Sequence, residues 1–118
     1  METEKQAVIT ERIVKEIKEY LGDKLDKIIL YGSYARGDYD EDSDIDILIL
    51  ANIEHTATPK YYPKLRDISH DISLENDVIL SLLFNSADFF NANAKTHAFC
   101  KNVIREGRIL YGSDSRFG

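Results

Sequence analysis

The sequence lacks cysteine pairs, long apolar runs and linker-like segments. Its single cysteine, Cys100, excludes an internal disulfide and is typical of a protein of the reducing cytoplasm. No apolar run approaches the ~18–20 residues that a membrane-spanning helix needs. The opening residues, METEKQAVIT, lack the basic start and apolar centre of a signal peptide. Repeats, low-complexity tracts and Pro- or Gly-rich linkers are also absent. We therefore expect one cytoplasmic domain, residues 1–118, with no membrane partner.

Basic residues are scarce relative to acidic ones. The chain has 15 Lys and Arg against 21 Asp and Glu, and its net charge is −6 at pH 7. An acidic surface repels the phosphate backbone of nucleic acids, so we expect no direct nucleic-acid binding by charge alone. The charge leaves open a basic protein partner, or a phosphate ligand that a metal ion neutralises. Hydrophobic residues make up 43% of the chain, which is enough for one modest core.

The apolar pattern predicts helices that alternate with strands. Ile9, Ile13 and Ile17 recur at helical spacing, and Gly22 is a natural end for that helix. The further predicted elements are strands at 25–31 and 45–50, a helix from Pro59 to about Glu75, a strand at 77–84, short helices near 86–90 and 96–106, and an edge strand at 108–111. This order predicts an α/β (α+β) fold, a small mixed β-sheet with helices packed on it.

The densest charge lies in YGSYARGDYDEDSDIDILIL, residues 31–50. Its acidic members are Asp38, Asp40, Glu41, Asp42, Asp44 and Asp46, and an apolar strand follows. Alternate strand residues point to the same face, so Asp44 and Asp46 project side by side and repel each other. A divalent cation removes that conflict, and Mg²⁺ prefers a few carboxylates together with phosphate oxygens and water. The alternative interpretation is a solvated acidic loop, which we expect for residues 38–42.

A Gly-Ser pair precedes the carboxylates at the end of the preceding predicted strand. Gly32 lets the backbone turn sharply and lets a ligand approach closely. Ser33 offers a hydroxyl and an amide N–H, and a helical turn that starts here would direct free N–H groups to the same cleft. A Gly-Ser pair after a strand is usually only a turn. Combined with a carboxylate pair on the next strand, it predicts a nucleoside triphosphate held by its phosphates.

These residues also resemble a known signature. In the polymerase-β-like nucleotidyltransferase superfamily, a Gly-Ser that is often followed by x-A-R-G precedes S-D-x-D and a hydrophobic run. The matching residues here are Gly32, Ser33, Ala35, Arg36, Gly37, Ser43, Asp44 and Asp46. The helix-first order and the length resemble the minimal nucleotidyltransferases, a subfamily that includes MntA-like antitoxins and is little more than the catalytic core. The resemblance implies a polymerase-β-like nucleotidyltransferase core.

The resemblance also implies roles for individual residues. Asp44 and Asp46 match the paired metal ligands of the family, which points to Mg²⁺, with two ions expected, and to ATP as the substrate. Gly32 and Ser33 match the triphosphate-binding turn. Arg36 either contacts phosphate or supports the loop by pairing with Asp42 or Asp44.

The family has a third carboxylate on a later strand, and Asp77 is the best match. This sequence departs from the pattern there, because Asn76 is polar where the family has an apolar residue. Glu75 is an alternative, and so is a site without the third acid, in which Asp77 only caps a strand. Loss of that acid would weaken the base that activates the attacking hydroxyl.

The resemblance implies an enzyme that transfers AMP, or another nucleoside monophosphate, from a triphosphate to a hydroxyl. The chain has no room for an acceptor-binding domain, so we expect the acceptor to dock as a partner protein or as a second copy in a homo-oligomer. Minimal nucleotidyltransferases are typically paired with a helical HEPN-type toxin and adenylylate one of its tyrosines. The alternatives are a non-catalytic antitoxin that neutralises the toxin by binding and, less favoured, a small-molecule (aminoglycoside) nucleotidyltransferase.

Overall fold

The computed structural model describes residues 3–40 and 43–114. The helices are α1 (Thr3–Leu21), α2 (Ser33–Arg36), α3 (Thr58–Asn76), α4 (Ala87–Asn93) and α5 (Ala98–Glu106); the strands are β1 (Leu25–Tyr31), β2 (Ile45–Ala51), β3 (Leu80–Ser86) and β4 (Arg108–Tyr111). Single turns of 3₁₀ helix at Gly22–Lys24 and His55–Ala57 follow α1 and precede α3. None of the helices in the described ranges is long and apolar enough to cross a membrane.

The four strands form one mixed sheet in the order β3-β2-β1-β4. β1 pairs antiparallel with both β2 and β4, whereas β2 pairs parallel with β3. β1 and β2 are the inner strands, and their continuous apolar runs suit strands that are covered on both faces. The predicted α/β fold with a small mixed sheet is confirmed, including the edge position of 108–111.

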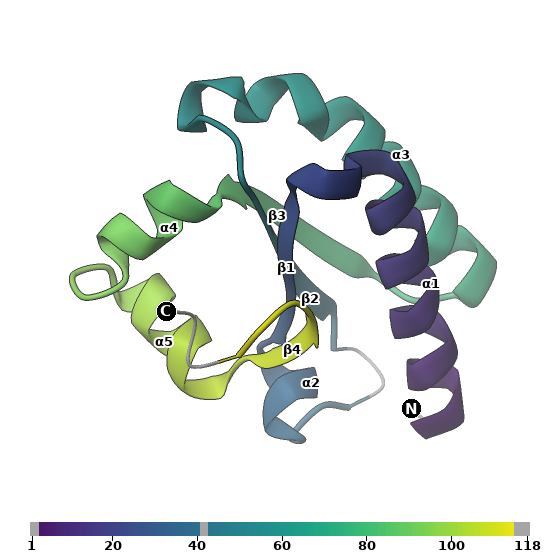
Figure 1. Cartoon of the computed structure of the whole chain (residues 1–118). Helices are drawn as coiled ribbons and strands as arrows, with labels where there is room; N and C mark the ends of the chain where they lie inside the picture. The colour runs from purple at the N-terminus through teal and green to yellow at the C-terminus, as the bar shows by residue number, and fades with distance from the viewer. Residues whose placement is uncertain (1–2, 41–42, 115–118) are drawn as a thin grey trace.

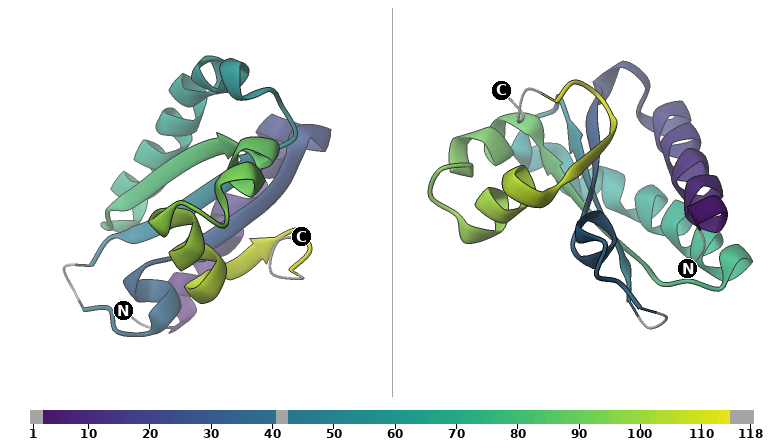
Figure 2. Two further views of the ribbon diagram at one scale, coloured as in Figure 1. Left: turned by 90° about the vertical axis from the view of Figure 1, so that its left-hand side faces the viewer. Right: turned by 90° about the horizontal axis from the view of Figure 1, so that it is seen from below.

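Helices cover both faces of this sheet (Figure 1). α1 and α3 pack on one face, where Ile45, Ile47 and Ile49 of β2 meet the apolar stripe of α1. α4 and α5 cover the other face, where Leu48 and Leu50 of β2 belong to the second cluster of buried residues. Because alternate strand residues point to opposite faces, one apolar run supplies both clusters. Figure 2 shows the same division from two further directions.

The helices begin and end where local chemistry favours it. Ile9, Ile13 and Ile17 are fully buried at four-residue steps, as predicted. Pro59 lies in the first turn of α3, where its missing N–H has no helical partner to lose. Ser86 caps α4, because its side chain accepts a hydrogen bond from the Phe89 N–H at 3.0 Å.

One predicted boundary is wrong. We expected the third strand to open at Asp77, but β3 begins at Leu80. Asp77 instead lies at the C-cap of α3 with φ 51°, and its N–H donates to the Ser73 carbonyl. An aspartate in this left-handed conformation ends the helix as a glycine commonly does. The apolar residues that follow Asp77 led us to expect strand from that point. The hydrogen-bonded pairing of β3 with β2 starts three residues later.

Candidate active site

The Gly-Ser turn and the carboxylate pair meet at one end of the sheet. β1 ends with Tyr31 directly opposite Asp46 of β2, and Gly32 follows Tyr31. Gly32 has φ 75°, and a Cβ added to it would overlap Oδ2 of Asp46 and lie 3.2 Å from its Cγ. Only glycine suits both this conformation and this close approach. The antiparallel register of β1 and β2 therefore places the turn against the carboxylate.

A short helix begins at the turn. Ser33 is the first residue of α2, and the Gly32 carbonyl accepts hydrogen bonds from the N–H groups of Ala35 and Arg36, both at 3.1 Å. Gly37 ends the helix in a left-handed conformation, with its N–H donating to the Ser33 carbonyl at 2.9 Å. The helical turn considered from the sequence is confirmed, and it holds Ser33 one residue from the glycine that touches Asp46.

The two carboxylates differ in their surroundings. Asp44 is exposed just before β2, while Asp46 is half-buried on the strand. Burial raises the pKa of the Asp46 carboxyl, the nearby charge of Asp44 raises it further, and Arg36 partly offsets these effects. Ionised Asp46 thus lacks full compensation from its neighbours, and a divalent cation would supply it. The donor set of the pair therefore fits Mg²⁺.

Asp77, the predicted third acid, lies at the C-cap of α3 and not on β3. Within residues 3–40 and 43–114, no three His, Cys, Asp or Glu side chains lie close enough together to hold a metal ion. The parallel register of β2 and β3 sets Ser81 beside Asp46, on the same face of the sheet. A hydroxyl therefore occupies the place next to Asp46 on β3, where a third strand-borne carboxylate would have to stand.

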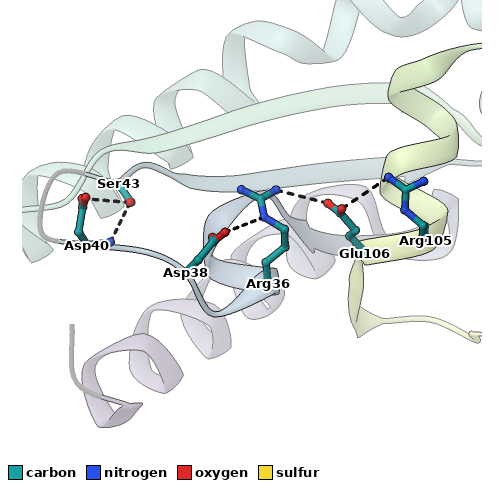
Figure 3. Close-up of polar contacts among 6 residues, drawn as sticks. All are labelled: Arg36, Asp38, Asp40, Ser43, Arg105 and Glu106. Carbon is teal, nitrogen blue, oxygen red and sulfur yellow. Dashed lines mark hydrogen bonds and ion pairs between the residues drawn. The ribbon is translucent and has the colours of Figure 1, made fainter.

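Arg36 connects α2 to its own loop and to α5 (Figure 3). Its Nε lies 3.1 Å from Oδ2 of Asp38, and its Nη1 lies 3.3 Å from Oε2 of Glu106. The pairing with Asp44 that we considered is replaced by these two partners, and Asp42 lies outside the described residues. Arg36 thus supports the loop, while its charge still acts on Asp46.

Sequence reasoning missed three residues that surround the turn. Tyr31 is half-buried beside Asp46, and burial together with the charge of Asp46 raises its pKa to about 12. Phe99 of α5 meets the Tyr31 ring at a centroid distance of 5.4 Å, and Glu106 binds Arg36. Tyr31 could have been noted as the last strand residue before Gly32. No local signal links α5 to the turn, because this contact depends on the chain's return across the sheet.

The sheet order, the Gly-Ser turn and the adjoining carboxylates define a nucleotide-transferring core, and the comparison with protein families agrees. Residues 11–116 match the family model described as polymerase beta, nucleotidyltransferase. The chain therefore belongs to the polymerase-β nucleotidyltransferase family. The resemblance seen in residues 32–50 is confirmed, and the match extends over residues 11–116.

Two individual proteins are similar to this chain over most of its length. The chain is 37% identical over 105 residues to a protein of Methanocaldococcus jannaschii provisionally named protein adenylyltransferase, and the match spans 86% of this chain and 97% of the relative. It is 28% identical over 104 residues to the protein adenylyltransferase MntA of Shewanella oneidensis, covering 86% of this chain and 64% of that one.

Solved structures share the fold. A toxin–antitoxin structure with AMP-PNP superposes with a TM-score of 0.59 at 22% identity, covering 92% of this chain and 77% of that chain. A chain of the MntA–HepT toxin–antitoxin structure gives 0.53 at 20% identity, with coverages of 91% and 73%. At this identity the superpositions establish the common architecture.

Proposed function

We propose that the chain is a Mg²⁺-dependent protein adenylyltransferase that transfers AMP from ATP to a tyrosine hydroxyl of a HEPN-type toxin and so acts as its antitoxin. The observation that carries the proposal is the contact between the Gly32 turn and Asp46, with Asp44 two residues away. The names of the relatives, which include protein adenylyltransferases and toxin–antitoxin structures, support the acceptor class.

The site residues divide the work between phosphate and metal. Asp44 and Asp46 would hold Mg²⁺, which when bound neutralises phosphate charge. Gly32 has no side chain and so lets the Asp46 carboxylate lie against the turn, and Ser33 donates to phosphate from its hydroxyl or amide. Arg36 contributes positive charge near the same carboxylates. In the transfer, the tyrosine oxygen bonds to the α-phosphorus, the bond to pyrophosphate breaks, and the hydroxyl proton passes to a base.

A base must accept this proton. Asp77 stays a predicted third ligand and base, but it caps α3, and Ser81 holds the place beside Asp46. The pair Asp44 and Asp46 therefore forms the core of the proposed site, and two Mg²⁺ ions remain the expected number. A missing base would slow the transfer without preventing nucleotide binding.

A direct transfer assay tests the proposal. The chain is incubated with α-³²P-labelled ATP, Mg²⁺ and a HEPN-type toxin as the candidate partner, and label on that protein is followed by gel and tyrosine-site mass spectrometry. We expect label on a tyrosine of the partner, dependent on Mg²⁺ and lost in the Asp44→Asn, Asp46→Asn double variant. Absence of label from all four α-labelled nucleoside triphosphates would contradict the enzymatic proposal.

A second candidate is an antitoxin that acts by contact alone. Ser81, and not a carboxylate, stands beside Asp46 on β3, and this favours it, because loss of the third acid would weaken the activation of the attacking hydroxyl. The same double variant separates the two candidates in cells that express the toxin. Loss of protection supports transfer, whereas full protection by the double variant supports contact.

A further inference from the structure

A small pocket opens beside the proposed phosphate turn. It lies between the end of β1 and α5, has a volume of about 160 Å³, and includes Gly32 in its wall. Tyr31, Phe99 and Asn102 line it as well. Since Gly32 also lies against Asp46, the pocket shares one residue of its wall with the carboxylate site.

The wall of the pocket is aromatic on one side and polar on another. Phe99 packs edge-on against Tyr31, with an angle of 87° between the rings, and remains 40% exposed. Val103 is buried and supplies an apolar floor. The exposed Asn102 side chain accepts a hydrogen bond from Arg105 through its carbonyl at 2.8 Å, which leaves its NH₂ group as a donor.

The Arg36–Glu106 ion pair forms part of the pocket wall. Both residues line the pocket, and their 3.3 Å contact joins α2 to α5 (Figure 3). The remaining space is smaller than the ~300 Å³ at which pockets for drug-sized ligands begin. It therefore suits a single flat ring system and is too small for a protein helix.

We propose that this pocket binds the nucleobase of ATP, with Phe99 as a stacking partner and the Asn102 amide as a hydrogen-bonding partner. The inference rests on the proposed function, since it assumes that the triphosphate lies on the Gly32 turn. Three observations lead to it: the shared Gly32, the exposed aromatic ring, and a volume that matches one base. Aromatic rings stack on any base, and the NH₂ group of Asn102 can donate to an acceptor nitrogen of adenine such as N7.

The test compares two ligands that share phosphates and differ in the base. Calorimetric titrations with Mg²⁺ present measure the Kd of ATP and of inorganic tripolyphosphate for the wild type and for Phe99→Ala. We expect the Kd of ATP to rise about tenfold in Phe99→Ala, within the range for loss of one base–aromatic stack. The Kd of tripolyphosphate should stay unchanged, because that ligand does not reach the pocket.

Matched variants exclude a general effect on the fold. Phe89 is also 40% exposed, but it lies on α4 and stacks on His55 outside the pocket, so Phe89→Ala should leave both Kd values unchanged. Phe99→Tyr keeps a ring at the site and should retain the wild-type Kd for ATP. Asn102→Ala should reduce the preference for ATP over CTP while leaving tripolyphosphate binding intact.

The outcomes separate this inference from the proposed function. An unchanged Kd of ATP in Phe99→Ala overturns the nucleobase assignment while nucleotide binding stands. The same holds if Phe99→Ala lowers labelling of the partner only, since the pocket would then receive the acceptor tyrosine. If the wild type binds neither ATP nor tripolyphosphate, the proposed function fails and the pocket assignment fails with it.

Discussion

The two faces of the sheet differ in function, although β2 supplies alternate residues to both. One face is purely structural, and the other carries the proposed active site. β2 directs Ile45, Ile47 and Ile49 to the α1/α3 face, and all three are fully buried. Toward the α4/α5 face it directs Leu48 and Leu50 and, at its open end, Asp46. A slip of one residue would move every side chain to the opposite face. The fully apolar face therefore fixes the register that places the carboxylate on the other.

The largest effect should come from the carboxylate end. We expect Asp46→Asn to lower AMP transfer by about 10²–10³-fold, because a ligand that holds the metal at the phosphates is lost. The fold should remain intact, since the substitution keeps the shape of the side chain. Steady-state labelling of the partner measures the loss, and residual transfer above a tenth of wild type would contradict the ligand role.

The same variant should be more stable than the wild type at neutral pH without metal. The pKa of Asp46 is raised in the folded protein, so its stabilising contribution is present below the unfolded pKa of about 3.8 and is lost as pH rises through the folded value. Asparagine does not ionise and suffers no such loss. Thermal melting between pH 3 and pH 7 should show a Tm advantage for Asp46→Asn that appears only at the higher pH values.

A substitution on the apolar α1/α3 face should lower stability and leave ATP binding unchanged. Ile47 is fully buried one residue from Asp46, and Ile47→Ala should lower the free energy of unfolding by about 2–4 kcal/mol through lost burial and a new cavity. The folded fraction should still bind ATP normally at low temperature. Urea unfolding measures the first effect and calorimetry the second. If Ile47→Ala had normal stability and weakened ATP binding, the α1/α3 face would not be the purely structural face that we expect.

The contact between the two regions can be tested at Gly32. Gly32→Ala should lower stability by about 1–3 kcal/mol, because it combines a left-handed backbone with overlap of Asp46. Gly37 is a control for the positive φ: it has φ 85° and ψ 6°, whereas Gly32 has ψ −154°, and nothing lies within 4 Å of a Cβ added to Gly37. Gly37→Ala should therefore show the backbone cost alone. Equal losses in the two variants would mean that the Asp46 contact contributes nothing.

Features that depend on neighbouring residues could be predicted from the sequence better than contacts between distant segments. β1 has the predicted bounds, because an apolar run ends at Gly32, a strong local stop. The paired carboxylates were recognised because their two-residue spacing has a direct meaning on a strand. The start of β3 was missed, since the left-handed Asp77 cap has no glycine to mark it. The partners of Asp46 on β3 and the pocket at Phe99 depend on register and packing between distant segments, which no local pattern specifies.

A smaller effect is expected from restoring a carboxylate beside Asp46. Ser81→Asp places a third acid next to the pair on β3. We expect a lower Tm without divalent cations, because of like-charge repulsion, and about tenfold tighter binding of Mn²⁺ as a Mg²⁺ substitute. Ser113→Asp, exposed beyond β4, adds the same charge elsewhere and should do neither. Equal Mn²⁺ affinity in Ser81→Asp and wild type would show that position 81 does not face the metal.

The smallest effect is expected at Asp77. Asparagine, like aspartate, adopts the left-handed conformation more readily than most residues. Asp77→Asn should therefore change the free energy of unfolding by less than about 0.5 kcal/mol. A C-cap residue outside the carboxylate pair should also leave transfer within about twofold of wild type, well inside one tenfold step of 1.36 kcal/mol. A third metal ligand would instead lose transfer on the scale expected for Asp46→Asn. Transfer assays of Asp46→Asn and Asp77→Asn side by side therefore decide whether the site uses two carboxylates, or a third one from the end of α3.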